Sequence, residues 1–183
     1  IIPQGRGLSK SVPIDTILEK IRNLVHKGFK EIVLTGVDIT CWGSDIAGND
    51  KLGDLVIKIL NEIPNLPRLR LSSLDVSEMD DRLIQVFKSN KRMMPHLHLS
   101  LQSGNNLILK RMKRRHSREQ AIDLCKDLKA ARPELTFGAD LIAGFPTESD
   151  TMFSDTIRLV DECGISWLHI FPYSGCLLYT SPS

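Results

Sequence analysis

Small and polar residues gather in five short segments of this 183-residue sequence: TGVDI (35–39), LSSLD (71–75), LSLQSG (99–104), DLIAGFPTES (140–149) and FPYS (171–174). Gly36, Gly104 and Gly144 permit close backbone approach to a ligand or a positive φ. Side chains that can hydrogen-bond a sugar or an amino-acid group accompany them: Ser72, Ser73, Gln102 and Ser103. One such segment is weak evidence, because glycine and serine are common where strands end. Five in order along one chain indicate a ligand site.

Each polar segment lies at the end of an apolar stretch that is typical of a strand. We expect strands at 31–37, 68–74, 96–102, 136–143 and 167–171. Between them, apolar residues at i, i+3 and i+4 predict helices near 13–27, 52–62, 80–89, 117–131 and 150–163, with Asp80 and Ser117 as N-caps and Gly28 and Gly164 as stops. Strands joined by single helices form a parallel sheet, and ligands of such α/β folds bind at the carboxyl ends of the strands.

The strand HLHLSLQ (96–102) alternates leucines with polar residues, which indicates two different environments. Its leucines should meet the helices, as should Leu168 and Ile170, which oppose His169 in the last strand. The polar residues should point into a barrel lumen. The expected polar lumen contains Arg70, His98, Ser100, Asp140 and His169. A closed eight-stranded barrel is filled by branched aliphatic side chains, so a wider or incomplete barrel that holds a polar ligand fits better. A closed barrel with a hydrogen-bonded polar core is the alternative.

The composition is that of one globular domain: 42% of residues are hydrophobic, 25% are charged, and the net charge is +2. No apolar run is long enough to span a bilayer and no signal peptide is evident, so we expect a cytoplasmic protein without membrane contact. Cys41, Cys125, Cys163 and Cys176 are scattered without C-x-x-C spacing, which favours neither a zinc site nor a disulfide framework. Cys125 and Cys163 are expected to be plain buried thiols.

Several motifs together resemble one family. IIPQGRG (1–7), LTGVDI (34–39), RLRLSSLD (68–75), PHLHLSLQSG (95–104), LKRMKRRHS (109–117), FGADLIAGFPTE (137–148) and HIFPYS (169–174) resemble the central domain of the radical S-adenosylmethionine (SAM) methylthiotransferases. The likeness is greatest to members that modify threonylcarbamoyladenosine, 3′ to the anticodon of tRNA. It implies a partial parallel (β/α) barrel of the radical SAM type. It also implies SAM and [4Fe-4S] clusters as cofactors, and the tRNA anticodon stem-loop and an electron donor as partners.

The resemblance also implies roles for individual residues. Gly36 and Asp38 match the segment that meets the amino group of SAM, although many radical SAM proteins carry Glu at the position of Asp38. Other matches are Ser73, Gln102 and Ser103 on the sugar and methionine side, Arg115 for the methionyl carboxylate, and Ile142 and Gly144 beside the adenine. The implied reaction activates SAM by one electron, removes hydrogen from C2 of the adenine, and inserts a sulfur that is then methylated.

The basic run KRMKRRHSR (110–118) has two interpretations. It is either a solvated face or a contact with tRNA phosphate. The candidates for that contact are Lys110, Arg111, Lys113 and Arg114, together with Arg6 in the segment GRG. Few aromatic residues accompany them, since the chain has two Trp and two Tyr, so base stacking by this region is not expected.

The two ends of the chain carry further expectations. In the family, IIP follows the third cysteine of a C-x-x-x-C-x-x-C loop, so we expect the cluster ligands directly before Ile1 and the first barrel strand outside the chain. Residues 1–174 would then be a core fragment, inactive alone and without the family's N-terminal and RNA-binding domains. The segment 175–183 departs from the family pattern; we expect a truncation or assembly scar in which Cys176 has no role, with a genuine tail packing on the barrel as the alternative.

Other functions remain open at this stage. The sister enzymes of the family modify isopentenyladenosine in tRNA or an aspartate of a ribosomal protein. A phosphate-binding α/β enzyme without metal would use the same glycines, but no Walker or G-x-G-x-x-G motif occurs. A domain that only binds SAM or RNA is the third possibility.

Overall fold

The computed structural model describes residues 9–175 of the chain. Five parallel strands alternate with helices in the order α2 (Ile14–His26), β1 (Glu31–Leu34), α3 (Leu52–Glu62), β2 (Arg68–Leu71), α4 (Asp81–Ser89), β3 (His96–Gln102), α6 (Arg118–Ala131), β4 (Thr136–Ala143), α7 (Asp150–Cys163) and β5 (Ile165–Pro172). Three short helices were not predicted: η1 (Ile39–Cys41), η2 (Val76–Glu78) and α5 (Asn106–Arg111). The α/β class and the partial parallel barrel are confirmed, and the strands of residues 9–175 do not close into a barrel.

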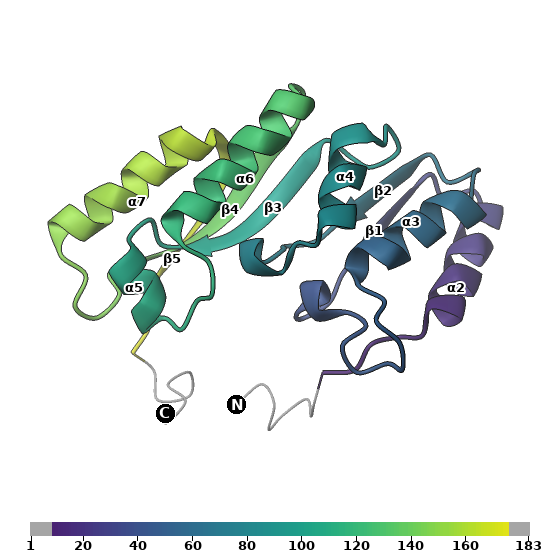
Figure 1. The fold of residues 1–183 in the computed structure, drawn as a ribbon, viewed down its shortest axis with the longest axis horizontal. Helices are drawn as coiled ribbons and strands as arrows, with labels where there is room; N and C mark the ends of the chain where they lie inside the picture. The colour runs from purple at the N-terminus through teal and green to yellow at the C-terminus, as the bar shows by residue number, and fades with distance from the viewer. Residues whose placement is uncertain (1–8, 176–183) are drawn as a thin grey trace.

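The strands are less continuous than the sequence predicted. β1 pairs with β2, and β3, β4 and β5 pair in that order, so two parallel sheets form instead of one. Isolated bridges, Leu69 to Met93 and Leu74 to Leu99, join the two sheets. Between these two bridges, no continuous pairing joins β2 to β3, because β2 ends at Leu71, three residues earlier than expected. The strands still form a curved array with the helices along one face (Figure 1).

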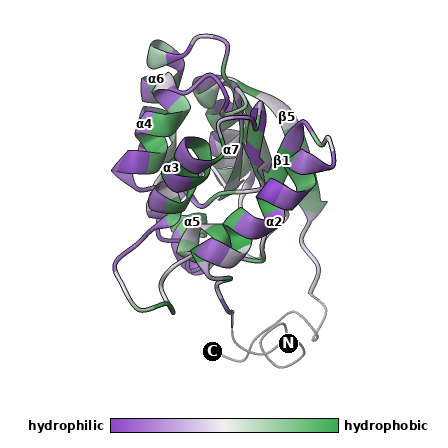
Figure 2. Cartoon of the chain, turned by 90° about the vertical axis from the view of Figure 1, so that its right-hand side faces the viewer, coloured by the Kyte–Doolittle hydropathy of each residue, from purple (hydrophilic) through white to green (hydrophobic). Residues whose placement is uncertain are grey.

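Alternation along β3 separates the core from the concave face, as the sequence predicted. Leu97, Leu99 and Leu101 are at most 1% exposed and belong to one hydrophobic core with residues of the covering helices. These helices are amphipathic, and apolar and polar patches alternate around them in Figure 2. His96 and His98 lie on the opposite face and are only half-buried. No helix within residues 9–175 has the length and apolar character needed to cross a bilayer.

Strand β5 corrects one expectation. Leu168 and Ile170 were expected to meet the helices, as the leucines of β3 do. They are instead 40% and 58% exposed, because β5 is the edge strand and α7 covers little of it within the described part of the chain. The segment 176–183 and its Cys176 lie outside the described residues, so the expectation about this tail stays a prediction.

The expected helix signals are present. Asp80 Oδ1 accepts a hydrogen bond from the Leu83 amide (2.9 Å), and Ser117 Oγ accepts one from the Gln120 amide (3.2 Å). Gly164 ends α7 in the left-handed conformation at φ 62°. The unpredicted α5 begins in the same way, because the side chain of Asn105 accepts from two amides of its first turn.

A buried arginine joins α4 to the strand that follows it. Arg132, 8% exposed, lies at the end of α6, and its Nη1 donates to the carbonyl oxygens of Phe87 (3.2 Å), Asn90 (3.2 Å) and Met93 (2.9 Å). These carbonyls lie where α4 ends and the chain turns toward β3, so one guanidinium satisfies acceptors that water does not reach.

We expect Arg132→Met to destabilise the chain by about 2 to 4 kcal/mol, because it leaves buried carbonyl oxygens without a donor. Urea unfolding followed by circular dichroism measures this. The control is Arg158→Ala, which removes a side chain that is 63% exposed and paired with Asp155; it should cost about 0.5 kcal/mol. Equal effects of the two substitutions would contradict this role of Arg132.

Candidate functional site

A polar cavity of about 550 Å³ opens at the carboxyl ends of the strands. Its walls come from the segments after β1 and β2, from β3 and β4, and from the loop after α5. The lining includes Gly36, Asp38, Ser72, Ser73, Asp75, Ser100, Arg114, Arg115 and Asp140. Four predicted cofactor residues, Gly36, Asp38, Ser73 and Arg115, therefore meet at one place. This location is the usual one for ligands in parallel α/β folds.

Arg114 is the most buried cation of this cavity, with a side chain that is 25% exposed. Its Nη2 donates to Asp75 Oδ2 (2.6 Å) and to the carbonyl oxygen of Ser100 (3.0 Å). Its Nε is buried without a hydrogen-bond partner among the described residues, as is Ser72 Oγ in the same lining. Two unsatisfied buried polar atoms indicate a polar ligand. The sequence predicted Arg114 as an RNA contact, and it indicated Ser72 as a hydrogen-bonding residue without a specific role toward the cofactor.

The electrostatics of Asp75 fix the position of Arg114. Burial raises the pKa of the Asp75 carboxyl, but nearby His116, hydrogen bonds from Ser77 and the charge of Arg114 together hold that pKa well below its usual value. The amide and the hydroxyl of Ser77 donate to Asp75 Oδ1 at 2.9 and 2.7 Å. Asp75 is therefore ionised at neutral pH and forms a charge-assisted hydrogen bond with Arg114.

Arg115 lies at the rim, where its side chain is 65% exposed and ion-paired with Glu78 of η2. The same carboxylate accepts from the Cys41 thiol at 3.3 Å. Burial and the neighbouring Asp38 raise the pKa of the Cys41 thiol, so it remains protonated at neutral pH. Arg114 and Arg115 thus pair with different carboxylates. Arg115, which the sequence predicted as the cofactor residue, is the more exposed of the two.

The other four predicted cofactor residues do not line this cavity. Gln102 ends β3 at a positive φ of 65°. Ser103 is 1% exposed, and its hydroxyl lies 3.4 Å from that of Thr156 in α7. Ile142 lies near the end of β4, and the Gly144 amide donates to Glu148 (2.9 Å). Their assignment to the cofactor stays a prediction.

The basic residues that the sequence predicted to contact tRNA phosphate lie around α5 and the loop that follows it, except Arg6. Lys110 and Lys113 are exposed. Arg111 is exposed as well, and its guanidinium donates to the carbonyl oxygen of Thr147 (3.3 Å) in the loop after β4. Arg6 lies outside the described residues. The loop that carries Lys113 also supplies Arg114 and Arg115 to the cavity, so this basic surface borders the cavity.

A second, apolar cavity of about 920 Å³ was missed by the sequence analysis. It lies between α2, β1 and the η1 region, and Ile17, Val33 and Trp42 are among its lining residues. Residues 35–38 line both cavities. In the sequence, Val33 stands out as an apolar residue on the same face of its strand as Glu31.

The pKa of Asp75 predicts how stability depends on pH. Because the folded-state pKa lies below the unfolded value of about 3.9, the ionised carboxylate stabilises the fold above that value. Its contribution is lost as the pH falls through the lowered pKa. We expect Asp75→Asn to cost about 1.5 to 3 kcal/mol at pH 7 and to reduce the loss of stability between pH 5 and pH 3, in urea titrations. The exposed Asp123, changed to Asn, is the control; an unchanged pH profile in Asp75→Asn would contradict the assignment.

Comparison with protein-family models matches residues 1–160 to the Radical SAM superfamily. A threonylcarbamoyladenosine tRNA methylthiotransferase (MtaB) of Rickettsia prowazekii is 51% identical over 174 residues, covering 95% of this chain and 41% of that protein. The MtaB of Aquifex aeolicus is 40% identical, covering 95% of this chain and 42% of that protein. A tRNA-2-methylthio-N(6)-dimethylallyladenosine synthase of Erythrobacter litoralis is 37% identical, with 95% and 39% covered. The chain spans about two fifths of the length of these relatives.

Solved structures share the fold. The radical SAM methyltransferase TsrM of Kitasatospora setae, with cobalamin and a [4Fe-4S] cluster bound, has a TM-score of 0.68 at 13% identity, covering 91% of this chain and 29% of that protein. SuiB of Streptococcus suis bound to S-adenosylmethionine has a TM-score of 0.62 at 12% identity, with 93% and 36% covered. The resemblance predicted from the motifs is confirmed by the matches to methylthiotransferases.

Proposed function

Because the chain belongs to the Radical SAM superfamily, we propose that its protein is a tRNA methylthiotransferase that modifies C2 of the threonylcarbamoyladenosine 3′ to the anticodon. The observation that carries this proposal is the 51% identity to a relative of that name, over 95% of the chain. The polar cavity at the strand ends supports it, because it offers unsatisfied polar atoms to a cofactor.

The cavity residues fit SAM. A volume of about 550 Å³ lies within the range of small-molecule sites. Arg114 offers its unpartnered Nε–H to the methionyl carboxylate. The Asp38 carboxylate suits the ammonium group, and the hydroxyls of Ser72 and Ser73 suit the ribose. SAM bound beside a reduced cluster supplies one-electron chemistry that can activate a C–H bond; the residues of this chain bind and orient it.

The described cysteines do not fit a [4Fe-4S] cluster, which needs converging thiolates. Cys125 and Cys163 are 1% and 4% exposed, on α6 and α7 in the core. Contact with Cys163 and burial raise the pKa of the Cys125 thiol, so it stays protonated at neutral pH. Cys41 lies against Glu78. The thiolates for a cluster therefore come from outside residues 9–175.

The basic surface beside the cavity supports a tRNA partner. Lys110, Arg111 and Lys113 are exposed around the loop that lines the cavity, and cations in such positions attract the phosphates of an anticodon stem-loop. The reaction also requires an electron donor, and we place the protein in the cytoplasm with its tRNA substrate. The dimethylallyladenosine synthases among the relatives, 37% and 38% identical, make isopentenyl-type adenosine in tRNA the second candidate substrate.

The test of this function uses the full-length protein, reconstituted anaerobically with iron and sulfide and supplied with SAM and a reductant. Its substrates are tRNAs that carry threonylcarbamoyladenosine, isopentenyladenosine or unmodified adenosine 3′ to the anticodon. We expect mass spectrometry of the nucleosides to show the added methylthio group on threonylcarbamoyladenosine. Product on isopentenyladenosine alone would favour the second candidate, and no product on any tRNA would reject both.

Arg114 and Arg115 give separate predictions for SAM affinity. In the full-length protein, we expect Arg114→Ala to weaken SAM binding by about 1.5 to 3 kcal/mol, because it removes a partly buried charged donor. Arg115→Ala should cost less, because that side chain is exposed and paired with Glu78. Equilibrium titration with SAM measures both. A larger loss in Arg115→Ala would restore the assignment made from the sequence.

A further inference from the structure

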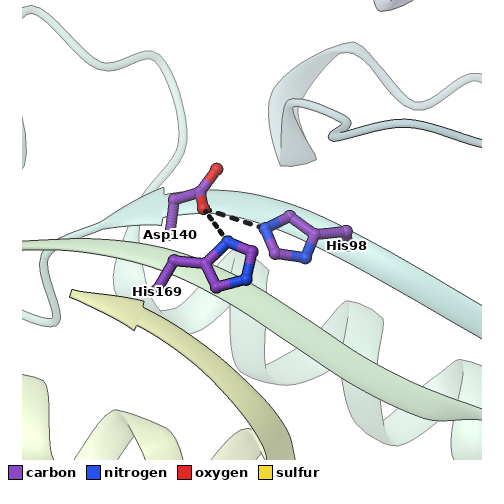
Figure 3. A group of neighbouring side chains, drawn as sticks. All are labelled: His98, Asp140 and His169. Carbon is purple, nitrogen blue, oxygen red and sulfur yellow. Dashed lines mark hydrogen bonds and ion pairs between the residues drawn. The ribbon is translucent and has the colours of Figure 1, made fainter. Parts of the chain in front are cut away.

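Three polar side chains meet on the concave face, outside the roles assigned so far. His98, Asp140 and His169 come from the neighbouring strands β3, β4 and β5, and both imidazoles point to one carboxylate oxygen (Figure 3). His98 Nε2 lies 3.0 Å and His169 Nδ1 lies 3.2 Å from Asp140 Oδ1. We call this group the His–Asp–His cluster.

The register of the strands builds the cluster. Asp140 pairs with His169, and His98 pairs with Gly138, which is two residues before Asp140 on the same face of β4. A Cβ at position 138 would lie 2.6 Å from His98 Nδ1. Only glycine at this position therefore lets the His98 ring lie over β4 and reach Asp140.

The two hydrogen bonds within the His–Asp–His cluster leave other acceptor atoms of the cluster free. Because an ionised carboxylate only accepts, His98 donates from Nε2 and His169 donates from Nδ1. The tautomer of His169 that donates from Nδ1 presents Nε2 as an acceptor, on a side chain that is 64% exposed. Asp140 Oδ2 makes no hydrogen bond to residues 9–175, and the Asp140 side chain is 20% exposed. The cluster thus offers two acceptors toward the lumen.

The position and the shape of the cluster indicate its ligand. Asp140 also lines the polar cavity proposed for SAM, so a molecule on the cluster lies next to the cofactor. The rings of His98 and His169 lie 5.0 Å apart at 36°. Flat rings beside free acceptors suit a planar heteroaromatic base that carries N–H donors.

We infer that the His–Asp–His cluster is the subsite for the reacting base: Asp140 Oδ2 and His169 Nε2 accept hydrogen bonds from N6–H of the adenine and from the second N–H of its threonylcarbamoyl substituent. This inference rests on the proposed function and specifies how the base is held beside the cofactor. The same three groups could ligate a divalent metal. The observed N–O distances are those of hydrogen bonds between the two rings and Asp140.

The test compares His169→Ala, His169→Gln and Asp140→Asn in the reconstituted full-length enzyme. We expect His169→Ala and Asp140→Asn to lower kcat/KM for the modified tRNA roughly tenfold or more, because each disturbs an acceptor for the base. His169→Gln keeps a side-chain acceptor and should recover part of the loss. SAM affinity of His169→Ala should stay within about twofold of the wild-type value, which a general loss of structure would not allow.

The matched control is His96→Ala. His96 lies on the same strand face, but its Nδ1 lies 3.1 Å from Thr136 Oγ1 and it does not line the cavity. The kcat/KM of the His96→Ala enzyme should stay within about threefold of the wild-type value, because this side chain does not touch the substrate. A wild-type enzyme that modifies no tRNA would overturn the proposed function and this inference together.

Two results would overturn the inference alone. The first is an active wild type whose His169→Ala and Asp140→Asn variants keep the wild-type kcat/KM. The second is one equivalent of zinc or iron beyond the clusters, bound by the wild type and lost in His169→Ala, measured by metal analysis. That result would assign the cluster to a metal.

Discussion

The alternation of side chains along β3 is the constraint on which the rest of the structure depends. Leu97, Leu99 and Leu101 are fully buried, and each contributes about 1.5 to 3 kcal/mol through burial. A shift of β3 by one residue would expose all three and bury the intervening histidines and serine. The core therefore holds the polar residues on the concave face, and His98 reaches Asp140 only in this register.

The same constraint determines what lies at the carboxyl ends of the strands. The carbonyl of Ser100, on the polar side of β3, accepts from Arg114, and Asp75 after β2 binds the same guanidinium. Arg114 thus joins the end of β2, the strand β3 and the loop after α5. Asp75 and Ser100 satisfy only part of the guanidinium, and its buried Nε has no hydrogen-bond partner among residues 9–175. The polar cavity and the His–Asp–His cluster share Asp140, so the proposed cofactor and the proposed base would lie side by side.

Much of the fold could be predicted because its signals are local. The periodicities of β3, β4, α3 and α7 gave the bounds that the structure has. The early end of β2 was not predicted. The amides of Leu69 and Leu74 donate to the carbonyl oxygens of Arg92 and His98, which are distant in sequence, so the local pattern does not indicate these contacts. α5 was also missed: with six residues it is too short for a clear helical period, and its cap at Asn105 was not recognised.

The site was predicted at the level of segments and less well at the level of side chains. All five polar segments lie at or just after the strand ends. Within the basic run 110–118, however, neighbouring side chains turn to different sides. Arg114 turns inward because Asp75 lies there, and Arg115 meets Glu78 at the rim. These carboxylates belong to a segment distant in sequence, so the run RMKRRHS alone does not say which arginine enters the cavity. Ser103, which the sequence predicted to contact the cofactor, faces Thr156 of α7. This partner is also distant in sequence.

We propose that a cofactor binds at the carboxyl ends of β1 to β4, around Arg114. Hydrogen–deuterium exchange of the full-length, cluster-loaded protein with and without SAM tests it most directly. We expect SAM to slow exchange in the segments 35–40, 72–75 and 114–115, which supply most of the lining residues of the polar cavity, and to leave the outer turns of α6 and α7 unchanged. Protection confined to other segments, with no change in these three, would contradict it.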